Sequence, residues 1–138
     1  MSEVTVRWLE AQRFVGVDST QHDIVIGGSD EDGRIGVKPS DLLLLALGSC
    51  TAYDVVGILD KKRQKLTGLE VRISGPQLPD APWTFTACHL HFIVKGHSLS
   101  GKAVEDAIHL ADEKYCSVAA TLRLGIPVTT DYELVQDK

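Results

Sequence analysis

Residues 38–56 read KPSDLLLLALGSCTAYDVV, and this stretch decides what kind of fold the chain can adopt. Pro39, Ser40 and Asp41 are typical of a helix start, because a serine or aspartate side chain can cap the first free backbone N–H groups. The expected helix runs from about residue 41 to about residue 63, and its first half is apolar on nearly every side. Such a helix is predicted to be buried in the middle of a fold rather than to lie on its surface.

The apolar run could also be interpreted as a membrane span. It covers residues 42–59, just short of the roughly 20 apolar residues that a span needs. It also carries the polar residues Ser49, Thr51 and Asp54, which favours a buried helix. Gly48, Ser49 and Gly57 are poor helix formers, and their small size predicts that another backbone or a partner helix comes close.

Strands are expected on both sides of this helix, because polar and apolar residues alternate there. The expected strands cover residues 4–8, 13–17, 23–26, 69–74, 84–94 and 129–135. A second helix is expected to open at Ser100 or Gly101 and to break near Cys116, where Ser117 would cap a short further helix. This order of elements predicts one α+β domain over residues 1–138, without regular βαβ alternation.

The composition of the chain argues against several classes of function. The formal net charge of −5 argues against nucleic-acid binding, and Lys61, Lys62 and Arg63 fall at a helix end, where they complement the helix dipole. The N-terminal residues alternate in polarity and do not resemble a secretory signal. Three cysteines without a CxxC motif exclude a secreted disulfide framework, a zinc ribbon and a thioredoxin motif. A cytoplasmic protein that binds no membrane and holds no cofactor is expected.

Each of the three cysteines has an inert and a reactive interpretation. Cys50 lies within the first helix, where a buried thiol is the ordinary outcome and Asp54, one turn on, disfavours the thiolate. Cys116 lies between two helices, where free backbone N–H groups can stabilise a thiolate, although a small core residue fits equally well. Cys88 lies on a strand and is assigned a structural role.

The histidines and the glycine-rich loop give weaker evidence for a functional site than the cysteines do. In the CHLH string at residues 88–91, strand alternation places Cys88 opposite the face shared by His89 and His91, so three metal ligands do not converge and no metal site is predicted. A hydrolase using Cys50 and a histidine is chemically conceivable, but no local motif supports it. The glycine-rich loop at residues 27–33 carries three acidic residues and precedes no GK[ST], which argues against phosphate binding.

Residues 38–56, together with KYCSV at residues 114–118, resemble the OsmC/Ohr family of osmotically inducible and organic-hydroperoxide-resistance proteins. The similarity extends over nearly the whole chain in the same order of elements. It implies an α+β fold in which antiparallel sheets wrap around central buried helices in an intertwined homodimer. It also implies that Cys50 is the peroxidatic cysteine and Cys116 the resolving cysteine of a thiol-dependent peroxidase. The implied partners are an organic hydroperoxide and an external dithiol reductant.

The chain departs from the best-understood members of that family. Those members have a glutamate after the proline that precedes the helix, paired with an arginine that activates the thiol. Here Ser40 occupies the glutamate position, and Arg13 and Arg34 are the candidate arginines, both expected to be solvated at the surface. The chain is therefore closer to OsmC-like members without the pair. A dimer that senses redox state or binds an apolar ligand is the alternative to a peroxidase.

Overall fold

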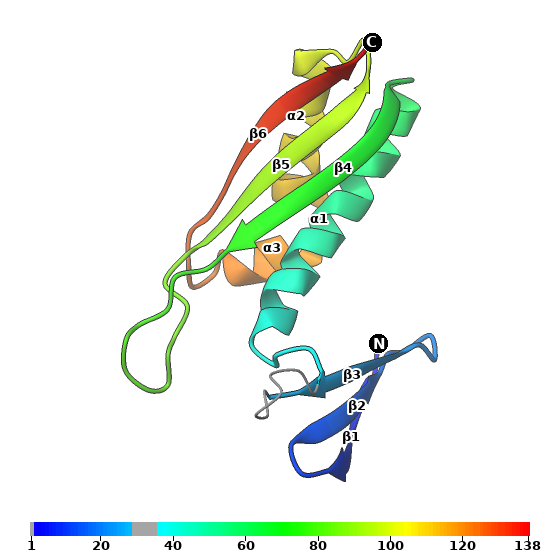
Figure 1. The fold of residues 1–138 in the computed structure, drawn as a ribbon. Helices are drawn as coiled ribbons and strands as arrows, with labels where there is room; N and C mark the ends of the chain where they lie inside the picture. Colours follow the sequence, from blue (N-terminus) through cyan, green and yellow to red (C-terminus); the bar gives the residue numbers. More distant parts are fainter. Residues whose placement is uncertain (1, 29–35) are drawn as a thin grey trace. The chain divides into compact units, whose positions relative to one another are not determined.

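The computed structural model describes residues 2–28 and 36–138, which form two compact units, Met1–Leu43 and Leu44–Lys138. The first unit is an antiparallel meander of β1 (Thr5–Glu10), β2 (Arg13–Val17) and β3 (Asp23–Gly27) (Figure 1). Several of its large apolar side chains are exposed, among them Val4, Val6 and Trp8. Residues 29–33 of the glycine-rich loop, and Arg34, lie outside the described residues.

The second unit is a three-stranded sheet with helices on one face (Figure 1). The strands are β4 (Lys65–Ser74), β5 (Cys88–His97) and β6 (Val128–Asp137), in that order across the sheet. The helices are α1 (Asp41–Lys61), which continues from the first unit, α2 (Gly101–Leu110), the π-helix η1 (Ala111–Tyr115) and α3 (Ser117–Leu122). This mixed architecture confirms the predicted α+β class.

One pairing departs from the antiparallel sheets that were expected. β4 and β5 are antiparallel, but β5 and β6 are parallel, with Cys88 opposite Val128 and His97 opposite Asp137. The helices between β5 and β6 return the chain to the end of the sheet where β5 begins, as a parallel crossover requires. The chain therefore contains one βαβ unit, although it lacks a regular alternation.

The core of the second unit lies between the sheet and the helices. On β5, Cys88, Leu90, Phe92 and Val94 are fully buried, while the residues between them are partly exposed. α1 contributes Leu47, Val55 and Leu59 to this core, and α2 contributes Val104 and Ala107. Gly48 explains how α1 lies so close to β4: a Cβ there would lie 2.3 Å from Cδ1 of Ile73. The close neighbour at Gly48 is thus a side chain of β4 rather than a backbone or a partner helix, and a Cβ at Gly57 would meet no atom within 4 Å in the described residues.

The long apolar helix belongs to this core. By length and composition α1 could cross a membrane. Its fully buried side chains pack against the sheet and α2, as in the core helix of a globular protein. The prediction of burial on nearly every side holds for this one face only, because Leu45, Tyr53 and Val56 on α1 are exposed in the single chain.

Most element boundaries agree with the predicted ones within a few residues. The strand expected at residues 84–94 begins only at Cys88, because Thr86 and Phe85 belong to the connection from β4, where the backbone N–H of Thr86 donates to the carbonyl of Pro76. β4 begins earlier than expected, at Lys65.

Candidate functional site

Two cysteines from distant parts of the chain meet on the helical side of the second unit. Cys50 lies on α1, half-buried and packed against the core. Cys116 lies between η1 and α3 and is 2% exposed. The Cys116 side chain is a near enough neighbour to raise the pKa of Cys50, and both cysteines are free. The fold therefore brings together the two cysteines that the sequence singled out.

The surroundings of Cys50 favour its neutral thiol. Burial raises the pKa of Cys50 above its usual value, and the hydrogen bond with Cys116 raises it further. A hydrogen bond from the backbone of Val118 lowers this pKa, while the negative charge of Asp54 raises it, as predicted. The thiolate of Cys50 is therefore a minor population at neutral pH.

Within residues 44–138, no cationic side chain is among the groups that act most strongly on the pKa of Cys50. The neighbouring side chains that act on this pKa are Cys116 and Asp54, and both raise it. Arg13, one of the two candidate arginines, forms an ion pair with Glu10 inside the first unit at 3.4 Å.

Cys116 lies at the sharp turn between η1 and α3, and the segment from η1 to the end of α3 is called the Cys116 corner below. Its backbone N–H donates to the carbonyl of Ala111 at 2.8 Å, which closes the wide π-turn of η1. Its sulfur accepts the N–H of Ala119 at 3.4 Å and so caps α3. The sequence predicted Ser117 as the cap of this helix, and that was wrong: Ser117 is already the first helical residue, and the cysteine sulfur takes the capping role.

An ion pair between the buried Asp112 and the partly exposed Arg123 escaped the sequence analysis. The Asp112 carboxylate binds the guanidinium of Arg123 through Oδ2 and Nη2, and Arg123 Nη1 donates to the backbone carbonyl of Asp112 at 2.7 Å. A signal for it was present, because Asp112 lies four residues after the buried Ile108 and so continues the apolar face of α2.

A groove lies between α1 and the α2–η1 segment, with a volume of about 490 Å³, and neither cysteine lines it. It is lined mainly by apolar surface, and two lysines and one aspartate contribute its charges. The lining residues are Tyr53, Asp54, Gly57, Ile58, Lys61, Lys62, Leu110 and Tyr115.

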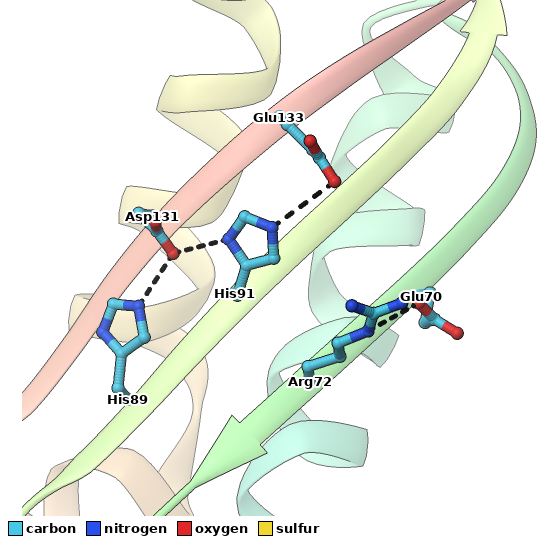
Figure 2. Close-up of polar contacts among 6 residues, drawn as sticks. All are labelled: Glu70, Arg72, His89, His91, Asp131 and Glu133. Carbon is cyan, nitrogen blue, oxygen red and sulfur yellow. Dashed lines mark hydrogen bonds and ion pairs between the residues drawn. The ribbon is translucent and has the colours of Figure 1, made fainter.

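Cys88, His89 and His91 separate as strand alternation predicted. Cys88 is fully buried on the helix-facing side of β5, where burial raises its pKa. Figure 2 shows the opposite face, where Asp131 Oδ1 accepts hydrogen bonds from His89 Nε2 and His91 Nδ1, both at 2.8 Å. Among the described residues, no three His, Cys, Asp or Glu side chains are arranged as metal ligands.

Comparison with known proteins identifies the family. The family model described as OsmC-like protein matches residues 28–131. Protein YhfA of Escherichia coli K12 is 39% identical over 133 residues, which span 96% of this chain and 98% of YhfA. The chain belongs to the OsmC-like family. The resemblance found in the sequence is thereby confirmed.

Solved structures show how widely the OsmC-like fold is shared. A hypothetical protein from Aquifex aeolicus VF5 is 27% identical, with a TM-score of 0.86 over 100% of this chain and 98% of its own. The organic hydroperoxide resistance protein OhrB of Bacillus subtilis is 14% identical, with a TM-score of 0.61 over 96% of this chain and 98% of its own. OsmC/Ohr proteins are dimeric and are associated with redox or peroxide-related roles.

Proposed function

We propose that this OsmC-like protein is a thiol-dependent peroxidase that reduces organic hydroperoxides through Cys50 and Cys116. The observation that supports this most strongly is that the two cysteines, which come from separate elements of the fold, pack in the same core and interact with each other. A dithiol couple suits a reducing compartment, where thiols do not persist as structural disulfides. We therefore place the protein in the cytoplasm.

The proposed reaction has three steps. The Cys50 thiolate attacks the distal oxygen of the hydroperoxide, so the S–O bond forms, the O–O bond breaks, and the alkoxide leaves as an alcohol after protonation. The Cys116 sulfur then attacks the resulting sulfenic acid, and hydroxide leaves as water with the proton of the Cys116 thiol. An external dithiol reduces the disulfide and is itself oxidised.

The difference in burial supports this assignment of roles. A hydroperoxide can approach Cys50, which is half-buried, more easily than Cys116, which is 2% exposed. A shielded resolving cysteine is spared direct oxidation and reacts only with the sulfur beside it. The raised pKa of Cys50 implies a slower peroxidase than one with an activated thiol.

The groove between α1 and the α2–η1 segment supports a second candidate function, a dimer that binds an apolar ligand or senses redox state. Its largely apolar lining can hold a hydrophobic molecule against Tyr53 and Asp54, about one helical turn from Cys50. In this case the ligand or the Cys50–Cys116 disulfide would raise the melting temperature, and peroxide turnover would be negligible.

We also propose that the chain acts as one domain over residues 1–138 within an intertwined homodimer. Large apolar side chains on α1, such as Leu45, Tyr53 and Val56, are exposed in the single chain. Covering such residues in a partner subunit would remove apolar surface from water. Light scattering coupled to size-exclusion chromatography would show twice the chain mass if this is correct.

The test of the peroxidase is peptide-mapped mass spectrometry after one equivalent of cumene hydroperoxide, with hydrogen peroxide for comparison. We expect a selective Cys50–Cys116 disulfide in the wild type. Cys50→Ser should consume no peroxide, and Cys116→Ser should stop after one slow turnover with a sulfenic acid on Cys50. Cys88→Ser is the matched control, and it should leave disulfide formation unchanged.

Peroxide consumption by Cys50→Ser at the wild-type rate would rule out the peroxidase. If both thiols stay reduced in the wild type, the ligand-binding function takes its place.

A further inference from the structure

The Asp112–Arg123 pair is unusual for its burial. The Asp112 side chain is 7% exposed, and its Oδ1 is buried without a hydrogen-bond partner in the described structure. Burial raises the pKa of Asp112, and the positive charge of Arg123 opposes that shift. A carboxylate held in this way gains less from pairing than it loses in solvation, so net stability is a weak explanation for it.

The location of the pair suggests another explanation. Asp112 belongs to η1, which ends at Cys116, and Arg123 caps the C-terminus of α3, which begins after Cys116. The guanidinium contacts both the side chain and the backbone carbonyl of Asp112. One side chain therefore joins the two ends of the corner in which Cys116 sits.

The corner needs such a connection because it is short and irregular. η1 is a five-residue π-helix and α3 has six residues, so neither is long enough to hold its own geometry firmly. The sulfur of Cys116 is used within the corner as the cap of α3, which ties its position to the angle between the two helices. A small change in this angle would move the sulfur relative to Cys50.

We propose that Asp112 and Arg123 are positioning residues for Cys116, which keep its sulfur within reach of oxidised Cys50; this rests on the proposed function. The pair acts on the second step of the reaction, in which Cys116 sulfur bonds to Cys50 sulfur and water leaves. It has no part in the first step, the attack of Cys50 on the hydroperoxide. A merely structural ion pair would not distinguish the two steps.

The test measures the two steps separately by quenched-flow mass spectrometry with a sulfenic-acid trap. In Arg123→Met, sulfenic acid formation on Cys50 should stay within about twofold of wild type, and disulfide closure should slow about tenfold or more, as misplaced reacting groups do. The unresolved sulfenic acid should then be oxidised further to sulfinic acid at excess peroxide. Arg123→Lys should recover part of the closure rate, because it keeps the charge but loses the forked contact.

The matched control is Arg72→Met, which removes an arginine from an ion pair with Glu70 on the outer face of the sheet (Figure 2). Asp112→Asn keeps the backbone carbonyl for Arg123 and provides a variant with a milder change if Arg123→Met folds poorly. Equal slowing of both steps, or closure at the wild-type rate in Arg123→Met and Asp112→Asn, would overturn the positioning role.

A second reaction separates this proposal from the peroxidase. Oxidised glutathione can place a mixed disulfide on Cys50 without any peroxide, and Cys116 then closes the ring and releases glutathione. One outcome is that the wild type fails to react with peroxide and still forms the Cys50–Cys116 disulfide from the glutathione mixed disulfide. If Arg123→Met then forms this disulfide about tenfold more slowly, the positioning role is supported and the peroxidase is ruled out. If Arg123→Met closes it at the wild-type rate, the positioning role falls.

Discussion

The two faces of the β4–β5–β6 sheet use polar groups in opposite ways. On the helix-facing side, Cys50 and Asp112 both have raised pKa values, and desolvation is the main cause for each. On the outer face, the hydrogen bond between His91 and Asp131 raises the pKa of the histidine and lowers that of the aspartate. Burial thus favours neutral acids on one face, and pairing favours charged groups on the other.

The difference shows on which face of the sheet a single polar group has the larger effect on stability and reactivity. Outer charges are solvated, so each of them contributes little to stability. Inner polar groups have few partners, so the position and protonation of each one matter more. The cysteine pair lies on the inner side, where a neighbour such as Asp54 can change the reactivity of a thiol.

The largest expected effect on the free energy of unfolding comes from the difference in packing between the two faces of β5. Phe92→Ala, on the inner face of β5, should lower the free energy of unfolding by about 3–5 kcal/mol, because it leaves a cavity in the core. Ile93→Ala, the next residue on the same strand but on the outer face, should cost about 1 kcal/mol. Urea denaturation measures both, and equal losses would mean that the two faces do not differ in packing.

The raised pKa of Cys50 on the helix-facing side can be tested by measuring how its reactivity changes with pH. Because its pKa is raised, its alkylation by iodoacetamide should accelerate about tenfold per pH unit from pH 7 upward. Asp54→Asn removes a negative charge that raises this pKa, so it should increase the rate at pH 7 about two- to fivefold. Peptide-mapped mass spectrometry follows Cys50 alone, with Asp60→Asn as the control on the same helix. A flat pH profile would contradict the predominance of the neutral thiol.

The smallest effect is expected on the outer face, from Asp131→Asn. The raised pKa of His91 makes its contribution fully present below the usual imidazole pKa of 6.5, and this contribution is lost as pH rises through the raised value. The lowered pKa of Asp131 makes its contribution present above 3.8 and lost as pH falls through the lowered value. Between these limits, wild type should melt slightly above Asp131→Asn.

Thermal melts at pH 5.5 and pH 9 would measure this difference. The gap between the two proteins should be present at pH 5.5 and shrink at pH 9. A gap that grows with pH would contradict the His91–Asp131 pairing.

The sequence was sufficient for features that depend on local patterns. Alternation on β5 separated Cys88 from His89 and His91, and the apolar run after Pro39 predicted a core helix. The family followed from two short segments around Cys50 and Cys116. Local patterns did not predict the parallel direction of β6, because strand direction depends on the path of the helices before it.

Local sequence patterns also did not predict the polar contacts within the site. Ser117 was the obvious cap by residue type, but the π-turn shifted the helix start so that Cys116 took the role. Asp112 looked like a surface residue by type, although its position in the apolar repeat placed it inside. Its partner Arg123 lies eleven positions away in the chain and is reached only because the corner folds back.

By itself, the sequence determined the α+β class, the position of the long first helix and the family of this protein, because hydrophobic periodicity and short motifs are properties of neighbouring residues. Tertiary structure decided that the Cys50 and Cys116 thiols meet, that burial disfavours the Cys50 thiolate, and that Arg123 joins the two ends of the Cys116 corner. These features depend on distances and solvent exposure, which arise only when α1, η1 and α3 pack together against one sheet.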